Sequence, residues 1–303
     1  MKILVFGGTG MIGGHAALHL RSCGHDVTIA ARKAPPAPSA LAALPFVRGD
    51  YVANDLARSE LARFDALVFA AGNDVRHLPA DGDSDAHWQR ANSEGVPRFF
   101  AAARDAGIRH AVNIGSFYPQ AYPKALESSA YVRSRKAAAD GVRALAAPGF
   151  RVMSINAPFV VGAVPGLVVP MFAAYTQYAQ GRIPAIPAFA PAGGVNFIST
   201  QSLSEAVAGA LERGHSGTAY LVGDENLSFA AYFGHFFRAC GRSAPLPVLD
   251  REHPMLPDAA LLAGRGNTIY YEPDAEQSRL LAYRRNDVGR TIAEVVEQYR
   301  GAP

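Results

Sequence analysis

The stretch ILVFGGTGMIG (residues 3–13) decides the fold class of this chain. It joins a short apolar run to glycines at positions 7, 10 and 13, and an apolar helical pattern follows at residues 16–20. A strand, a glycine turn and a helix in this order present backbone N–H groups and the positive end of a helix to a pyrophosphate. An ordinary strand-to-helix turn is the alternative. Because the context that the motif requires is present, we expect a dinucleotide-binding turn.

Composition and charge exclude several classes of protein. The chain has 303 residues, of which 49% are hydrophobic and 18% charged, and a formal net charge of +3. No run of Lys and Arg supplies the basic stripe of a nucleic-acid-binding protein, and no uninterrupted apolar segment of about 18 residues predicts a membrane span. Cys23 and Cys240 lie far apart in helical surroundings and are expected to be reduced packing residues. Because the N-terminal apolar residues belong to the first strand rather than to a signal peptide, we expect a soluble, cytoplasmic protein.

The first half of the chain alternates apolar, β-type runs with helical stretches. This rhythm indicates an α/β fold with a doubly wound parallel sheet of the Rossmann type. We expect strands at residues 3–6, 26–30, 46–48, 65–71, 110–114 and 150–156, and helices at about 84–106 and 131–146. The second half is less regular and rich in proline, which suggests a smaller C-terminal lobe above the sheet, where substrate pockets usually lie.

The residues after the second strand favour NADP over NAD. A free ribose 2′-hydroxyl is usually held by Asp or Glu about twenty residues after the glycines, whereas residues 30–33 of this chain read AARK. Arg32 offers a planar fork to a 2′-phosphate and Lys33 adds a second positive charge. Two solvated cations in a loop are the alternative. Asp50, at the end of the third strand, is placed to accept a hydrogen bond from the adenine amino group.

Ser116, Tyr131 and Arg135 are the candidates for proton transfer. Ser116 follows the fifth strand, and Tyr131 begins a helix on which Arg135 shares its face, four residues later. A phenol with a pKa of about 10 is a poor acid or base at neutral pH, and a nearby cation favours its ionised form. Each residue alone is more often structural. Together, beside a nucleotide site, they predict an acid–base site.

The chain resembles the extended branch of the short-chain dehydrogenase/reductase superfamily, whose members are often described as NAD-dependent epimerases/dehydratases. The resemblance covers nearly the whole chain and rests on GGTGMIG (7–13), GD (49–50), AAG (70–72), Asn92, PFVVG (158–162), NFI (196–198) and GTAYLVG (217–223). It implies that Ser116 and Tyr131 are the catalytic serine and tyrosine. It also implies cofactor contacts from Gly7, Thr9, Gly10, Met11, Ile12, Gly13, Ala70, Ala71, Gly72, Pro158 and Val160.

The same resemblance predicts how the chain is divided. Residues 1–157 are expected to form an NADP-binding Rossmann core, and residues 158–303 mainly a substrate-binding lobe, with residues 195–223 returning to the core sheet. Helices like those expected at 84–106 and 131–146 often pair between subunits in this family, so the resemblance implies a homodimer.

One departure from the family falls in the catalytic motif. The family's lysine, four residues after the tyrosine, is Arg135 here, and Lys136 follows one position later. In the family that lysine holds the nicotinamide ribose and lowers the pKa of the tyrosine; arginine keeps the charge and the donors but is not readily deprotonated. Lys136 lies about 100° further round an ideal helix, so it would fill the role only if the helix were wound differently. Tyr118 and Tyr122 are alternatives to Tyr131 as the phenol.

Two classes of function follow from these features. The first is an NADP-dependent oxidoreductase that transfers a hydride between the nicotinamide and a small ketone, aldehyde or alcohol, with Tyr131 as acid/base. NAD(P)-dependent sugar-nucleotide epimerisation or dehydration is an alternative that begins in the same way. The second class is a non-catalytic NADP-binding sensor or regulator. A polar stretch with His77, Asp81, Asp83, Asp85 and His87 matches no metal motif, so no metal site is expected.

Overall fold

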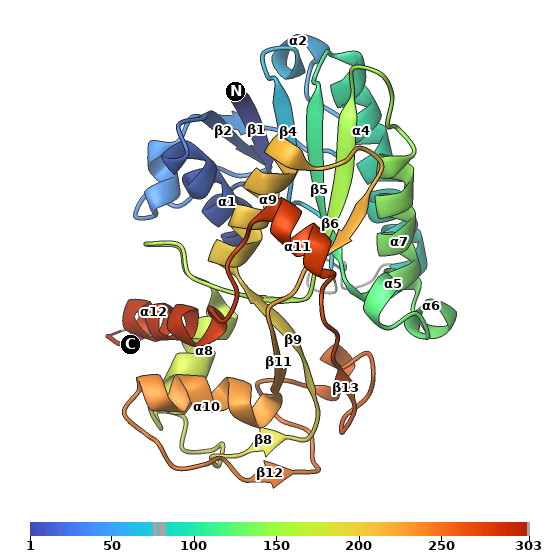
Figure 1. Ribbon diagram of the computed structural model, residues 1–303. Coiled ribbons are helices and arrows are strands. Elements are labelled where there is room, and N and C mark those ends of the chain that lie inside the picture. Colours follow the sequence, from blue (N-terminus) through green and yellow to red (C-terminus); the bar gives the residue numbers. More distant parts are fainter. Residues whose placement is uncertain (75–77, 79–82, 302–303) are drawn as a thin grey trace.

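A seven-stranded parallel sheet forms the centre of the molecule (Figure 1). The computed structural model describes residues 1–74, 78 and 83–301. The strand order is β10-β6-β5-β4-β1-β2-β3, and each neighbouring pair is parallel. The strands are β1 (Lys2–Phe6), β2 (Asp26–Ala31), β3 (Phe46–Arg48), β4 (Ala66–Phe69), β5 (His110–Ser116), β6 (Arg151–Ala157) and β10 (Ala219–Leu221). The expected doubly wound α/β fold is confirmed.

Both faces of this sheet are buried, which explains why its strands are continuous apolar runs. In β1, Ile3 and Val5 belong to the core on the side of helices α1 (Met11–Ser22) and α9 (Thr200–Arg213). Leu4 and Phe6 face the core on the side of α4 (Val96–Asp105) and α7 (Ala130–Arg143). The two helical layers flank the sheet in Figure 1. The shorter helices are η1 (Ala40–Ala43), α2 (Arg58–Leu61), α5 (Tyr118–Ala121), α6 (Ala125–Ser128) and α11 (Ala275–Leu281).

The helix expected at 84–106 is one helical run with a wide turn in its middle. It consists of α3 (Ser84–Trp88), the π-helical turn η3 (Gln89–Gly95) and α4. The Asp83 carboxylate caps its start by accepting hydrogen bonds from the backbone N–H groups of Asp85 and Ala86. This accounts for Asp83 as a helix cap, while His77 and Asp81 of the same polar stretch lie outside the described residues.

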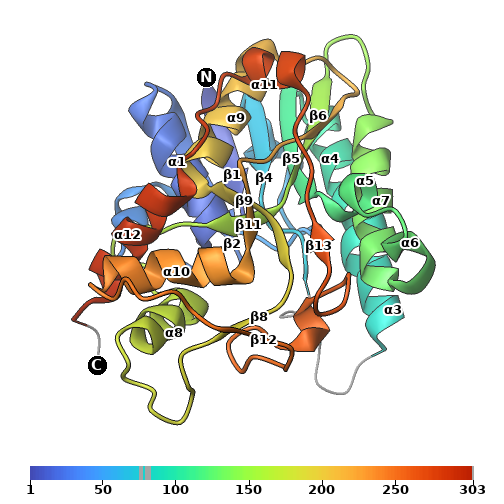
Figure 2. The same cartoon turned by 60° about the horizontal axis from the view of Figure 1, so that its bottom comes forward.

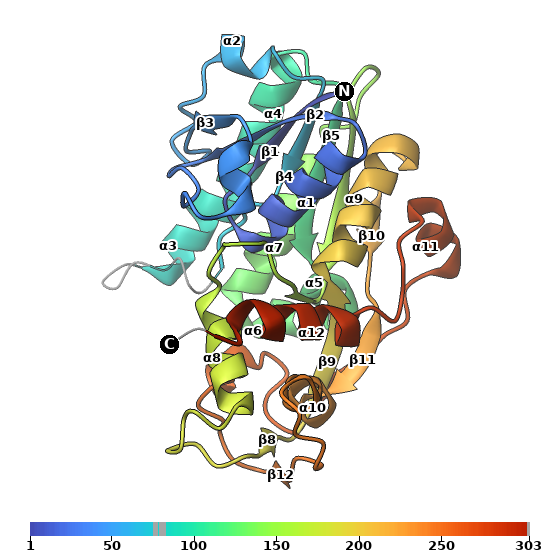
Figure 3. The same ribbon diagram turned by 90° about the vertical axis from the view of Figure 1, so that its left-hand side faces the viewer.

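The smaller lobe follows the carboxyl end of β6 and lies beneath the sheet in Figure 3. A four-stranded sheet joins it to the core, and helices α8, α10 and α12 pack together over an aromatic interior (Figure 2). Its elements are β7 (Phe159–Val161), α8 (Pro170–Ala179), β8 (Ala190–Pro191), β9 (Gly194–Ser199), β11 (Glu225–Ser228), α10 (Phe229–Ala239), β12 (Val248–Leu249), η4 (Asp258–Ala260), β13 (Thr268–Ile269) and α12 (Val288–Tyr299). Among the described helices, none has both the length and the apolar character needed to cross a membrane.

The return of residues 195–223 to the core sheet begins later than expected. Strand β9 pairs with β7, β11 and β13 in the lobe, whereas α9 packs against α1 and β10 forms the edge of the central sheet beside β6. The sequence pattern does not distinguish these cases, because both sheets offer β9 a buried position: all six of its residues are buried.

Candidate active site

Backbone contacts explain the glycines of the turn between β1 and α1. Gly7 has φ +84°, and a Cβ there would lie 2.7 Å from the Ala70 carbonyl carbon; a Cβ at Gly13 would lie 2.4 Å from the Gly7 oxygen. The turn, the first helical residues and the end of β4 are therefore in contact through their main chains. Gly10 occupies the N-cap position of α1, and no side chain of the described residues accepts a hydrogen bond from the N–H groups there. That arrangement leaves the N–H groups of the first helical turn for an anionic ligand.

Arg32 and Lys33 are exposed directly after β2, one strand away from the glycine turn. The Gly7 N–H donates to the Ala30 oxygen at 2.7 Å, which fixes the end of β2 beside the turn. Asp50 follows β3, the next strand along the sheet, and its Oδ1 accepts a hydrogen bond from the Val52 N–H at 2.9 Å. The two cations and Asp50 thus border the edge of the sheet at which the resemblance expects the adenosine half of a dinucleotide.

Arg135 connects three parts of the site. Its Nη1 donates to the Tyr131 hydroxyl at 3.3 Å, and its Nη2 donates to the Ile114 carbonyl of β5 at 3.2 Å. The guanidinium also lies against Gly72, after β4, where a Cβ would be 3.2 Å from Cζ. The predicted pair of a phenol and a cation therefore exists, at the carboxyl ends of two central strands.

Lys136 lies outside this site, which corrects its inclusion among the candidate catalytic residues. Its Nζ forms an ion pair with the Asp140 carboxylate, which also holds Arg143, and half of the Lys136 side chain is exposed. Helix α7 is α-helical throughout Ala130–Arg143. One further residue therefore turns the side chain about 100° away from the face that carries Tyr131 and Arg135.

Ser116 ends β5, and Tyr118, the first residue of α5, is a neighbour of Tyr131. Ser116 is buried, and its Oγ accepts a long hydrogen bond from the Tyr118 N–H at 3.5 Å. Burial, and next the neighbouring Tyr131, raises the pKa of the Tyr118 phenol above its usual value. Of the tyrosines considered, Tyr131 is the one to which Arg135 donates, whereas the Tyr118 ring packs on Phe117 at 4.2 Å between centroids. This contact distinguishes Tyr131 from Tyr118 as the candidate phenol.

The other residues expected at the cofactor lie on the same side of the sheet, where its strands have their carboxyl ends. Ala70 and Ala71 follow β4, and the Ala70 N–H donates to the Phe6 oxygen at 2.7 Å. Pro158 is buried between β6 and β7, and Val160 pairs with Ile198 of β9. The expected residues of the turn are Gly7, Thr9, Gly10, Met11, Ile12 and Gly13; Gly10 is exposed, Gly13 is buried and the other four are partly exposed.

Sequence reasoning missed a cluster of buried polar side chains on β5 and β6. Asn113 Nδ2 donates to Ser154 Oγ, Ser154 Oγ donates to Asn156 Oδ1, and Asn156 Nδ2 donates to Gln120 Oε1 at 2.5 Å. A Cβ at Gly115 would lie 2.1 Å from Asn156 Oδ1. The requirement for glycine at 115 therefore comes from a neighbouring strand, and no local pattern signals it.

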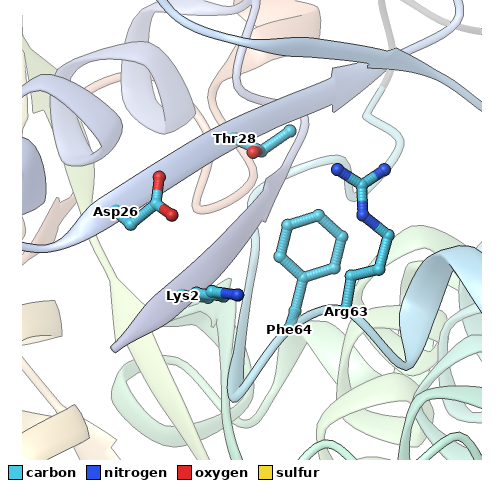
Figure 4. Close-up of a pocket in the computed structure, with 5 residues that line it drawn as sticks. All are labelled: Lys2, Asp26, Thr28, Arg63 and Phe64. Atoms are coloured by element: carbon cyan, nitrogen blue, oxygen red, sulfur yellow. The ribbon is translucent and has the colours of Figure 1, made fainter.

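A pocket elsewhere on the core is not part of this site. Figure 4 shows it lined by Lys2, Asp26, Thr28, Arg63 and Phe64. Lys2 and Asp26 begin β1 and β2, so the pocket lies at the amino ends of the strands. Ligands of open parallel sheets bind at the opposite, carboxyl ends, where Tyr131, Arg135 and the glycine turn are found.

Comparison with known proteins places this geometry in a family. The NAD dependent epimerase/dehydratase family model matches residues 3–189. Solved structures with the same fold include gox2253 (18% identity, 99% of this chain and 98% of that chain, TM-score 0.75). They also include UDP-glucose-4-epimerase from Stenotrophomonas maltophila with bound NAD and formylated UDP-arabinopyranose (20% identity, 99% of this chain and 98% of that chain, TM-score 0.74). A third is UDP-N-acetylglucosamine 4-epimerase from Bacillus cereus (16% identity, 100% of this chain and 98% of that chain, TM-score 0.72). No curated protein sequence matches the chain significantly. The match over more than half of its length shows that the chain belongs to the NAD-dependent epimerase/dehydratase family.

Proposed function

We propose that the chain is a nicotinamide-dependent enzyme that acts on a carbon bearing a hydroxyl or carbonyl oxygen, with Tyr131 as the acid/base. The observation that carries this proposal is the hydrogen bond from Arg135 to the Tyr131 hydroxyl at the carboxyl ends of β4 and β5. The chain also fits the cofactor, because the close backbone contact between Gly13 and Gly7 holds the turn against α1, and the uncapped start of α1 leaves backbone N–H groups for a pyrophosphate.

The side chains have separate roles in this reaction. When bound, the nicotinamide supplies or accepts the hydride. Tyr131 gives a proton to the substrate oxygen during reduction and takes it back during oxidation. Ser116 donates a hydrogen bond that orients the same oxygen. Arg135 orients the phenol through its hydrogen bond to the hydroxyl, but it passes no proton, because a guanidinium is not deprotonated in proteins.

Arg32 and Lys33 support NADP as the preferred dinucleotide. Both are exposed at the end of β2, and residues 30–33 contain no carboxylate that would repel a 2′-phosphate. A guanidinium fork matches phosphate geometry. The test is to compare the dissociation constants of NADPH and NADH with the purified protein; equal affinities would contradict the preference.

A nucleotide-linked sugar is the first candidate substrate class. Its support comes from the relatives: the UDP-glucose-4-epimerase superposes on 99% of this chain, including the lobe above the site. In that reading, Tyr131 removes the proton from a sugar hydroxyl and returns one to the ketone, and the dinucleotide is regenerated within one turnover.

A small ketone or aldehyde is the second candidate. Arg32 favours it, because NADP serves simple reductases more often than enzymes that retain the dinucleotide, and the lobe beside the site is rich in aromatic residues. This candidate predicts net consumption of NADPH, whereas epimerisation predicts none.

One experiment separates these readings. The protein is incubated with a panel of UDP-sugars and added NAD⁺ or NADP⁺, followed by NMR for epimerised or dehydrated products. In the second arm it is incubated with NADPH and mixed aldehydes and ketones, followed by absorbance. Tyr131→Phe should lower the rate at least about a hundredfold, while Tyr232→Phe, which alters a phenol in the lobe interior, should not change it. Tight dinucleotide binding with no turnover of any UDP-sugar, aldehyde or ketone would overturn the proposal of an enzyme and favour a non-catalytic sensor.

A further inference from the structure

Tyr51 directs its phenol into the interior beneath the candidate site. It follows Asp50 directly, and only 5% of its surface is exposed. Its ring meets Phe69 edge-on at 4.9 Å and Phe6 at 6.0 Å. A Cβ at Gly95 of the π-helical turn would be 3.3 Å from the Tyr51 ring, so the absence of a side chain there leaves room for the phenol.

The Tyr51 hydroxyl begins a chain of buried hydrogen bonds. Asn73 Nδ2 donates to it at 2.5 Å. Asn92 then holds the Asn73 main chain from both sides: Oδ1 accepts from the Asn73 N–H at 3.0 Å, and Nδ2 donates to the Asn73 oxygen at 3.1 Å. Asn92 Nδ2 also donates to Ser134 Oγ at 3.1 Å, and Ser134 Oγ donates to the Tyr131 carbonyl at 2.7 Å.

This chain of hydrogen bonds joins the two ends of the expected cofactor site. One end is the Asp50 turn, on the side expected to hold adenine, and the other is the first turn of α7, which carries Tyr131. Between them, Asn73 follows Gly72, against which the guanidinium of Arg135 lies. Since Tyr51, Asn73, Asn92 and Ser134 are all buried, loss of one link leaves a polar group without a partner and shifts its neighbours.

The phenol stays protonated at neutral pH. Burial raises the pKa of Tyr51 to about 12, although the hydrogen bond from Asn73 and the charge of Arg135 act in the opposite direction. The chain of hydrogen bonds that begins at this hydroxyl therefore does not change with the pH of ordinary assays.

We propose that Tyr51 is a positioning residue that acts through Asn73 and Asn92 on the Tyr131–Arg135 pair, and so couples the adenine side of the site to its catalytic side. Its hydroxyl fixes the Asn73 amide, and the Asn73 main chain holds Gly72 against the guanidinium of Arg135. This inference rests on the proposed function, because the pair it positions is the proposed acid–base pair.

Tyr51→Phe tests the coupling, because it removes the hydroxyl and keeps the ring. Trp88 is the single tryptophan of the chain and lies 5.2 Å from the Tyr131 ring, so its fluorescence reports on the site without turnover. We expect Tyr51→Phe to change the Trp88 emission of the folded protein and to lower kcat about tenfold, with a much smaller change in substrate KM. Tyr232→Phe is the matched control, since it removes an equally buried phenol hydroxyl that has no partner in the described structure.

A double-mutant cycle gives the decisive result. Ser134→Ala cuts the chain of hydrogen bonds at its other end. If Tyr51→Phe does not fold, Asn73→Ala replaces it, because that variant removes the amide that donates to the Tyr51 hydroxyl. If both act through one chain, the double variant should lose about tenfold in kcat, as each single variant does, whereas independent effects would multiply to about a hundredfold. A multiplied loss, or a Trp88 emission unchanged by Tyr51→Phe, would overturn the coupling. If neither the parent protein nor any variant shows turnover, while the Trp88 emission still changes in Tyr51→Phe, the proposed function is refuted and the coupling is not.

Discussion

Arg135→Lys keeps the positive charge of the site and removes its fork. The present guanidinium serves two acceptors on different elements, the Tyr131 hydroxyl at 3.3 Å and the Ile114 carbonyl at 3.2 Å. A lysine Nζ reaches about as far as the Cζ atom of arginine, and each Nη lies roughly 1.3 Å beyond that atom, one C–N bond. The ammonium group therefore reaches one acceptor well, and the other would lie beyond hydrogen-bonding distance.

The expected loss follows from the bond that is given up. A hydrogen bond to a charged group contributes about 1.5–3 kcal/mol. If lysine keeps the Ile114 carbonyl, the contact with the Tyr131 hydroxyl is lost and the phenol is no longer oriented. We therefore expect kcat to fall between about tenfold and a hundredfold, and the dissociation constant of the dinucleotide to change less, because the glycine turn is untouched.

The assay is steady-state turnover of whichever substrate the panel identifies, with dinucleotide binding and thermal unfolding measured on the same preparations. Lys136→Met is the matched control: it removes the adjacent cation, which pairs with Asp140 on the exposed face of α7, and should leave kcat unchanged. An Arg135→Lys variant as fast as or faster than the parent would refute the reasoning, because the arginine would then be a defective replacement for the family's lysine. Loss of activity in Lys136→Met would refute the placement of that residue outside the site.

Three further predictions concern other parts of the molecule. Arg32→Ser should raise the dissociation constant of NADPH about tenfold and leave that of NADH unchanged, as isothermal titration can show; equal effects on both would contradict a 2′-phosphate contact. Gly13→Ala should abolish dinucleotide binding and lower the melting temperature, because its Cβ would lie 2.4 Å from the Gly7 oxygen; retained binding in a titration would contradict this. Burial, and next His19, lowers the pKa of His15 from 6.5 to about 4, so the neutral form is favoured on folding and stability is lost as the pH falls from 6.5 toward 4. Denaturant unfolding should therefore show a loss of about 2 kcal/mol at pH 5 relative to neutral pH that His15→Gln lacks; equal losses in both proteins would contradict it.

Local sequence patterns predict the sheet and the contact between Tyr131 and Arg135. The strands of the core could be predicted because a parallel strand buried on both faces is a continuous apolar run, and the choice of Arg135 over Lys136 follows from helical periodicity. The wide turn at Gln89–Gly95 could not be predicted, since it depends on how the helix packs over Tyr51 and α7. The same holds for Gly115, whose requirement arises from Asn156 on the next strand.

The buried hydrogen bonds between Tyr51 and Ser134 favour an active enzyme over a protein that only binds a dinucleotide. Replacing a buried polar network by apolar side chains of similar shape is often neutral or stabilising, so stability alone is a weak reason for the network of Tyr51, Asn73 and Asn92. The dinucleotide contacts proposed above come from the glycine turn, α1 and Arg32, and none of these requires a phenol held by a guanidinium. What the network adds is a fixed position for Gly72, and with it for the Arg135 fork that contacts Tyr131. A site that had lost its chemistry together with the lysine would have no use for that precision, whereas an acid–base site adapted to arginine needs it.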